Sequence, residues 1–246
     1  MNLIESDAKE FIRRLPEISG FSVHLLALAI RSRLAKELMG IKVHDLFVER
    51  KIIRPYSDWR DNYFQRLENL ATLQKDGKYY YKELPVPSEA RAIFATITPR
   101  NARFAMADVL NYGIKSAMIG GDADVNDFAS RFDVEFFAAC HRHKTRDNFH
   151  AMTLDIDKPE YFKPVRDMVS SLTTWMVLQT SRGYHIVIDV SQKGSAEFHK
   201  GGGIWDKIHT AYGDGVELQH DAQEPVPGTL YHKIGSKEPN YVRIVE

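Results

Sequence analysis

The hydrophobic pattern predicts helices in the first third of this 246-residue chain. Residues 21–39 and 58–73 carry apolar side chains at helical spacing, and Gly40 follows the first of these segments. Both segments are predicted to be amphipathic helices, with Asp58 as the N-cap of the second. Residues 1–88 are therefore expected to form a helical N-terminal segment of unknown role.

The pattern changes after residue 88, where a soft domain boundary is predicted. Short apolar runs bounded by turn residues predict strands at 91–97, 149–156, 175–179, 184–190, 216–219 and 241–245. Helices are expected at 101–113, from about residue 127, at 159–172 and at 203–211. This mixture predicts an α+β fold for residues 89–246, with an antiparallel or mixed sheet.

Composition and charge narrow the class of protein. Hydrophobic residues make up 43% and charged residues 27%, as in soluble globular domains, and 33 Lys+Arg balance 33 Asp+Glu. Zero net charge excludes an overall basic nucleic-acid-binding protein but allows a local basic groove. The longest apolar stretch, residues 21–30, is shorter than the roughly 20 residues that cross a bilayer, and the N-terminus lacks the basic start of a signal peptide. The single cysteine, Cys140, excludes an intramolecular disulfide and a multi-cysteine zinc site. A cytoplasmic protein without a membrane partner is expected.

A pair of aspartates ends the strand predicted at 149–156. Residues i and i+2 of a strand face the same side, so Asp155 and Asp157 present their carboxylates together. Adjacent carboxylates repel one another unless a cation lies between them, and oxygen ligands favour Mg²⁺ or Mn²⁺. An exposed strand end or a structural pair of acids fits the same pattern.

A basic turn containing glycine separates the strands predicted at 175–179 and 184–190. Gly183 permits an unusual backbone or a close approach by a ligand, and the planar guanidinium of Arg182 suits phosphate oxygens. His185 opens the following strand. A turn arginine beside a hydrogen-bonded core histidine is the alternative interpretation.

A third acid and a rigid loop follow. Glu217 offers a carboxylate on the strand predicted at 216–219, with Asp221 and Asp214 as rivals. Downstream, a Pro-Gly-Thr turn could aim the hydroxyl of Thr229 and the ammonium of Lys233 into a cleft. An ordinary β-turn explains the same residues.

The order of these parts resembles the archaeo-eukaryotic primase superfamily, the catalytic domain of primases and primase-polymerases. The D-h-D motif of the family is matched by Asp155-Ile156-Asp157, and its third acid by Val216-Glu217. Its S-x-R-G-x-H type run is matched by Arg182-Gly183-Tyr184-His185, with Thr180 at the usual serine. A P-G-S-L-H-x-K-like loop is matched from Pro227 to Lys233, with Tyr231 where a histidine is common. The resemblance covers about residues 90–246, and the zinc-binding cysteines of many members are absent.

The resemblance implies a primase-type catalytic domain with an RRM-like core, acting as a DNA-templated nucleotidyltransferase that primes or extends. It implies two divalent ions, Mg²⁺ or Mn²⁺, held by the catalytic acids Asp155, Asp157 and Glu217. The phosphates of an incoming NTP or dNTP would be contacted by Arg182, His185, Thr229 and Lys233. The implied partners are a single-stranded DNA template and a primer strand, with a replicative helicase or a single-strand-binding protein as further candidates.

Contacts to the DNA backbone must come from local basic residues, because the chain as a whole is neutral. Two basic segments, one before the strand at 149–156 and one at the start of the helix at 101–113, supply the candidates Arg100, Arg103, Arg142, Lys144 and Arg146. A solvated basic loop is the alternative for both segments.

Three other interpretations compete with a polymerase. A D-x-D glycosyltransferase also holds a nucleotide diphosphate through a divalent ion, but no nucleotide-binding βαβ region precedes the D-x-D here. A non-catalytic DNA-binding module of replication initiation would have a decayed site, whereas the three acids and His185 are all present. The third alternative is a structural α+β domain.

Overall fold

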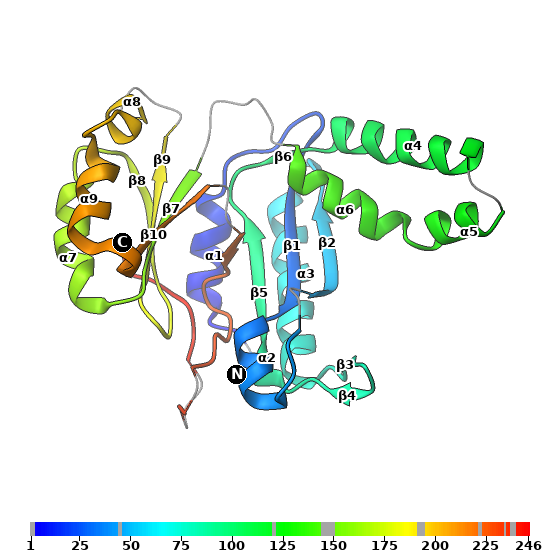
Figure 1. The fold of residues 1–246 in the computed structure, drawn as a ribbon, viewed down its shortest axis with the longest axis horizontal. Helices are drawn as coiled ribbons and strands as arrows, with labels where there is room; N and C mark the ends of the chain where they lie inside the picture. The colour runs from blue at the N-terminus through cyan, green and yellow to red at the C-terminus, as the bar shows by residue number, and fades with distance from the viewer. Residues whose placement is uncertain are drawn as a thin grey trace.

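The computed structural model describes residues 3–43, 46–119, 122–143, 151–190, 195–220, 223–233, 235–236 and 240–246. These residues form an α+β structure in which two antiparallel sheets lie side by side, with helices around them (Figure 1). The general α+β class predicted from the sequence is confirmed. Within the described part of the chain, no helix combines the length and the apolar character needed to cross a membrane.

The first sheet has the strand order β11-β5-β1-β2, and β6 pairs with the start of β1. Its strands are β1 (Ser22–Ile30), β2 (Leu46–Ile53), β5 (Arg91–Thr96), β6 (Arg100–Asn101) and β11 (Gln223–Pro225). One of its faces packs against α1 (Glu5–Arg14) and α3 (Trp59–Asp76), and the other against α4 (Ala102–Ile119) and α6 (Phe132–Arg142).

Strand β1 corrects the prediction of a helix at 21–39. All nine of its residues are buried, with Leu26 and Leu28 in the core beneath α1 and α3 and Leu25 in the core beneath α4 and α6. Because both faces of the strand are covered, it has no alternating polar positions and resembles an apolar helix in sequence. Only α2 (Ser32–Met39) is helical in this segment, and Gly40 ends it in the left-handed conformation.

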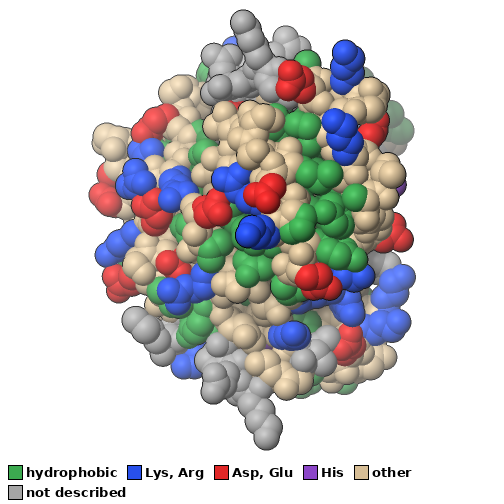
Figure 2. Space-filling view, turned by 90° about the vertical axis from the view of Figure 1, so that its left-hand side faces the viewer, with side chains coloured by type: hydrophobic (Ala, Val, Ile, Leu, Met, Phe, Trp, Pro, Cys, Tyr) green, Lys and Arg blue, Asp and Glu red, His purple; other side chains and the backbone are tan. Residues whose placement is uncertain are grey.

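The second sheet has the strand order β10-β7-β9-β8-β12 and agrees well with the predicted strands. Its strands are β7 (Ala151–Ile156), β8 (Thr174–Gln179), β9 (Tyr184–Asp189), β10 (Val216–His220) and β12 (Arg243–Ile244). The helices α7 (Pro159–Met168), α8 (Ser195–His199) and α9 (Ile204–Tyr212) pack on one face of this sheet. Lys, Arg, Asp and Glu side chains are interspersed over the outside of this layer (Figure 2).

The two sheets share one hydrophobic core. Leu28 and Ile93 of the first sheet belong to the same cluster as Met176, Leu178 and Val187 of the second. Strands β1 and β2, from the segment expected to be helical, pair in one sheet with β5 from beyond residue 88. The first 88 residues are therefore not an all-helical segment.

The remaining elements lie at the margins. Helices α4, α5 (Asp122–Ser130) and α6 project from the first sheet as an arm (Figure 1). The strands β3 (Tyr80–Tyr81) and β4 (Leu84–Pro85) form a small hairpin, and two short turns, η1 (Ser88–Ala90) and η2 (Gly213–Gly215), precede β5 and β10.

Candidate functional site

Three of the predicted site residues lie in one cross-strand row of the second sheet. Asp155 on β7 pairs with Glu217 on β10 and, on its other side, with His185 on β9. Residues directly opposite one another project from the same face of an antiparallel sheet. The register therefore brings the two acids and the imidazole together, on the face turned away from α7 and α9.

The basic turn between β8 and β9 reaches the end of β7 because residue 183 is glycine. A Cβ atom at Gly183 would lie 1.8 Å from the carbonyl oxygen of Ile156, so another residue type would force the two strands apart. Thr180 Oγ1 accepts hydrogen bonds from the backbone amides of Arg182 and Gly183, each at 3.2 Å. This close packing places Arg182 Nη2 3.7 Å from Asp157 Oδ1.

His185 lies between two carboxylates, one from each sheet. Its Nδ1 is 2.7 Å from Glu224 Oε2 on β11, and its Nε2 is 3.4 Å from Asp155 Oδ1. Burial alone would lower the pKa of His185, but the negative charges of Glu224, Asp155 and Asp157 outweigh burial and raise it. His185 therefore favours the charged imidazolium form, which links the two acids.

A further acid at this site, Glu224, was not identified from the sequence. It is buried, with only 1% of its surface exposed. Thr153 Oγ1 on β7 donates to its second oxygen, Oε1, at 2.5 Å. The carboxylate thus extends from an edge strand of the first sheet to two strands of the second. The only sequence signal was an acid between the strand predicted at 216–219 and the Pro-Gly-Thr turn, which many surface loops also show.

Negative charge concentrates around Asp155. Burial raises the pKa of its carboxyl, His185 lowers it, and the nearby charges of Asp157, Glu224 and Glu217 raise it further. Gln219 Nε2 donates to Asp155 Oδ2 at 3.1 Å. A cation would relieve this repulsion.

The donor set fits Mg²⁺ or Mn²⁺ by its chemistry, because Asp155, Asp157 and Glu217 all offer carboxylate oxygens. Among the residues that the structure describes, no group of three or more His, Cys, Asp or Glu side chains is already arranged to hold a metal ion. The rival acid Asp214 lies in the turn before β10, and Asp221 lies outside the described residues.

The four predicted phosphate-binding residues do not all face the same space. Arg182 and Lys233 line one pocket, whereas both ring nitrogens of His185 face carboxylates. Thr229 corrects the prediction: its exposed fraction is 0%, and its hydroxyl donates to the carbonyl of Val226 at 2.6 Å.

The Pro-Gly-Thr turn instead anchors the start of α1. The backbone amide of Ile4 donates to the carbonyl of Gly228 at 2.8 Å. Gly228 has a φ of +83°, and a Cβ atom there would lie 2.4 Å from the carbonyl oxygen of Ile4. The turn thus has a structural role in the fold.

The predicted DNA-binding residues are also separated. Arg100 is only 1% exposed and donates to the carbonyl of His141, so the prediction that it contacts DNA is corrected. Arg103 is exposed beside the Phe21 ring, 5.5 Å from its centre. Arg142 is exposed and lies 3.7 Å from Asp108. Lys144 and Arg146 lie outside the described residues.

The pocket that contains Arg182 and Lys233 is also lined by two cations that the sequence did not reveal. They are Arg31 and Arg33, which flank Ser32 where β1 ends and α2 begins. Their signal is visible only if residues 21–30 are recognised as a strand, because charged side chains that directly follow a buried strand gather at one end of a sheet.

Comparison with known proteins adds no family to this description: no family model, curated protein or solved structure matches the chain.

Proposed function

We propose that the protein is a metal-dependent nucleotidyltransferase that joins NTPs or dNTPs on a DNA template, as a primase or a primase-polymerase. The observation that carries this proposal is the row Glu217–Asp155–His185, with Asp157 just after β7 and Arg182 in the β8–β9 turn beside it. It sets oxygen ligands for a hard cation directly beside a guanidinium suited to phosphate. That combination matches what the transfer of a nucleotide from its triphosphate requires.

The topology of the second sheet supports the same proposal. Its elements follow the order β7-α7-β8-β9-α8-α9-β10, with the central strands arranged β10-β7-β9-β8. With α8 and α9 taken together as one helical connection, this order agrees with the β-α-β-β-α-β pattern expected of an RRM-like core. The row of acids and imidazole uses three of these strands, β10, β7 and β9.

The roles follow from position. When bound, Mg²⁺ or Mn²⁺ would lower the pKa of an attacking 3′-hydroxyl and neutralise charge on the triphosphate. Asp155, Asp157 and Glu217 would hold the ions. His185 acts as a positioning residue, because its ring orients Asp155 from one side and Glu224 from the other. Positioning and charge stabilisation are most of what a protein contributes to such a transfer.

The decisive experiment is primer synthesis and extension on a DNA template, with labelled NTPs and dNTPs, in Mg²⁺ and in Mn²⁺. In the double variant Asp155→Asn with Asp157→Asn, we expect activity to fall by on the order of 10³-fold or more. The melting temperature should stay the same or rise, because repulsion between acids is removed. Asp167→Asn, an exposed carboxylate on α7, is the matched control and should retain full activity.

Two results would contradict the proposal. One is full activity in the double variant, and the other is a wild-type chain that incorporates no nucleotide with either ion, with or without a primer. Metal-dependent binding of a nucleotide sugar, without binding of a nucleoside triphosphate, would instead favour the D-x-D glycosyltransferase.

A further inference from the structure

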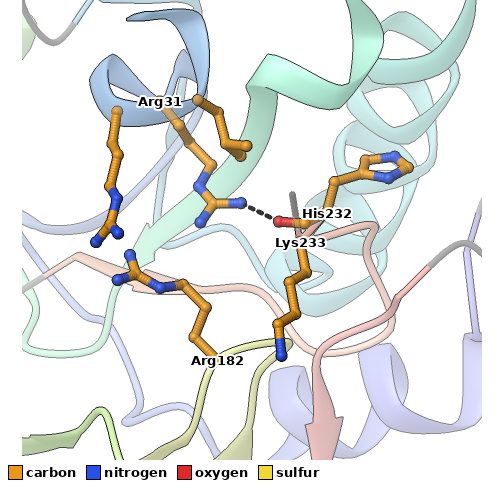
Figure 3. A pocket seen from close by; sticks show the side chains of 6 residues that line it. Arg31, Arg182, His232 and Lys233 are labelled. Atoms are coloured by element: carbon orange, nitrogen blue, oxygen red, sulfur yellow. Dashed lines mark hydrogen bonds between the residues drawn. The ribbon is translucent and has the colours of Figure 1, made fainter. Parts of the chain in front are cut away.

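Next to the acids lies a pocket in which four of the six lining residues, three arginines and a lysine, are cationic. It has a volume of about 160 Å³ and is lined by Arg31, Arg33, Leu34, Arg182, His232 and Lys233 (Figure 3). These residues come from three separate parts of the chain: the junction of β1 and α2, the β8–β9 turn and the segment after β11. The pocket therefore exists only in the folded chain.

Arg31 is held firmly in this pocket. Its Nη1 donates to the carbonyl of His232 at 2.7 Å, drawn as the dashed line in Figure 3. Its guanidinium carbon lies 3.7 Å from the centre of the Tyr231 ring, in a cation–π contact. These two contacts fix the guanidinium without an acid, so its positive charge remains available to a ligand.

The positive charges of the pocket are not neutralised by the other side chains that line it. Among the described residues that line it, none is an acid. Asp157 lies 3.7 Å from Arg182 and Glu37 lies 3.4 Å from Arg33, but both acids stand outside the lining. Burial lowers the pKa of Arg31, and repulsion from the neighbouring charges of Arg182 and Arg33 lowers it further.

A second cavity, of about 340 Å³, adjoins the first and shares Arg31, Arg33 and Arg182 with it. The lining that is its own includes three aromatic rings and an amide, from Phe47, Phe94, Tyr231 and Gln223. Flat rings beside a cationic pocket suit a ligand that joins a planar group to an anionic chain.

We propose that the cationic pocket binds the polyphosphate chain of a nucleotide, and that Arg31 and Arg33 are phosphate-binding residues together with Arg182 and Lys233. A chain of adjacent phosphates offers several negative charges within one small volume, which a single carboxylate ligand does not. Planar guanidinium groups match phosphate oxygens in pairs. The assignment to a nucleotide rests on the proposed function, whereas the assignment to a polyphosphate rests on the pocket alone.

The test is calorimetric titration of the full chain with inorganic tripolyphosphate in EDTA at low salt. We expect Arg33→Ala, in which a side chain that is 68% exposed is shortened, to fold normally and to weaken binding by on the order of tenfold or more. Arg31→Lys should weaken binding too, because the ammonium cannot replace the planar fork. Lys36→Ala removes one exposed charge from the same helix outside the pocket, and it should bind tripolyphosphate as tightly as the wild type.

Titrations with a dNTP, and with a single-stranded oligonucleotide carrying or lacking a 5′-phosphate, identify the source of the phosphates. Tighter binding of the dNTP than of either oligonucleotide supports the proposal. Binding that requires the 5′-phosphate of the oligonucleotide and is stronger than tripolyphosphate binding would overturn it in favour of a strand end. Equal tripolyphosphate affinity in wild type, Arg33→Ala and Arg31→Lys would also overturn it.

The same titrations separate this inference from the proposed function. Tripolyphosphate binding that depends on Arg33, in a chain that incorporates no nucleotide, would support the pocket and contradict nucleotidyl transfer. Nucleotide incorporation that proceeds unchanged in Arg33→Ala and Arg31→Lys would support the transfer and contradict the pocket.

Discussion

The two sheets of this protein contribute to the candidate site in different ways. One face of the second sheet is covered by α7, α8 and α9, whereas its other face packs partly into the core shared with α1 and the first sheet and presents Asp155, His185 and Glu217 in register. The first sheet is covered on both faces along β1, so its contributions come from an edge strand, with Glu224, and from a strand end, with Arg31. The difference teaches that a fully covered sheet can still supply polar groups to a site, but only from its margins.

The largest expected effect tests whether the two sheets depend on one another. Leu28→Ala removes a fully buried side chain from the core that both sheets share, and it should lower the free energy of unfolding by about 2–5 kcal/mol. Urea unfolding monitored by circular dichroism measures the free energy of unfolding, and hydrogen exchange measures the protection of the β7 and β9 amides. Because the core is common, those amides should lose protection together with β1.

Leu38→Ala, on the exposed side of α2, is the control and should change the free energy of unfolding by less than about 0.5 kcal/mol. If β7 and β9 kept wild-type protection in Leu28→Ala, the two sheets would be independent units and the idea of a shared core would be wrong.

The next effect concerns the second sheet and the tight turn beside its acids. Gly183→Ala introduces a Cβ atom where the Ile156 carbonyl oxygen lies, and it should cost about 1–3 kcal/mol of stability. The displaced turn should also move Arg182 away from Asp157. The rate of primer extension should therefore fall even at temperatures at which the variant is fully folded. Thermal unfolding and primer extension below the melting temperature measure the two effects.

Gly201→Ala is a suitable control, because an added Cβ there meets no atom within 4 Å and its φ is ordinary. Wild-type activity and stability in Gly183→Ala would show that the turn does not need this close approach.

The smallest expected effect tests the contact between the sheets through Glu224 and His185. The folded-state pKa of His185 is raised above its unfolded value of about 6.5. Its contribution to stability is therefore fully present below pH 6.5 and is lost as pH rises through the folded-state pKa. In Glu224→Gln, the pKa of His185 should fall, and the variant should be less stable than the wild type by about 1 kcal/mol at pH 6, with a smaller difference at pH 9.

Imidazole resonances titrated by NMR, together with urea unfolding at several pH values, measure this change. Glu160→Gln, an exposed acid on α7, should leave the His185 titration unchanged. A His185 pKa that is the same in Glu224→Gln and in the wild type would remove the electrostatic link between the sheets.

The two sheets also differ in how well the sequence predicts them. Strands β7, β8, β9 and β10 are short apolar runs bounded by turn residues, so their positions could be predicted. Strand β1 could not, because burial on both faces removes the alternation that marks a strand. With that strand misread as a helix, Arg31 and Arg33 had no place in the predicted site.

The predictions for two single residues were wrong for a related reason. Arg100 and Thr229 are polar residues in turn-rich segments, which favours exposure, yet both are buried and bonded to backbone carbonyls. A motif states which side chain is present but not which way it points. The polymerase activity itself stays a prediction, resting on the resemblance and on the placement of the acids.

By itself, the sequence determined the α+β class, the strands of the second sheet and the types of chemical group available to the site, because these depend on local periodicity and residue identity. The tertiary structure alone decided that Glu224 reaches His185, that Arg31 and Arg33 join Arg182 and Lys233, and that Arg100 and Thr229 lie inside. Those outcomes depend on which distant segments pack together. Packing is set by the summed burial of many side chains, which no short stretch of sequence encodes.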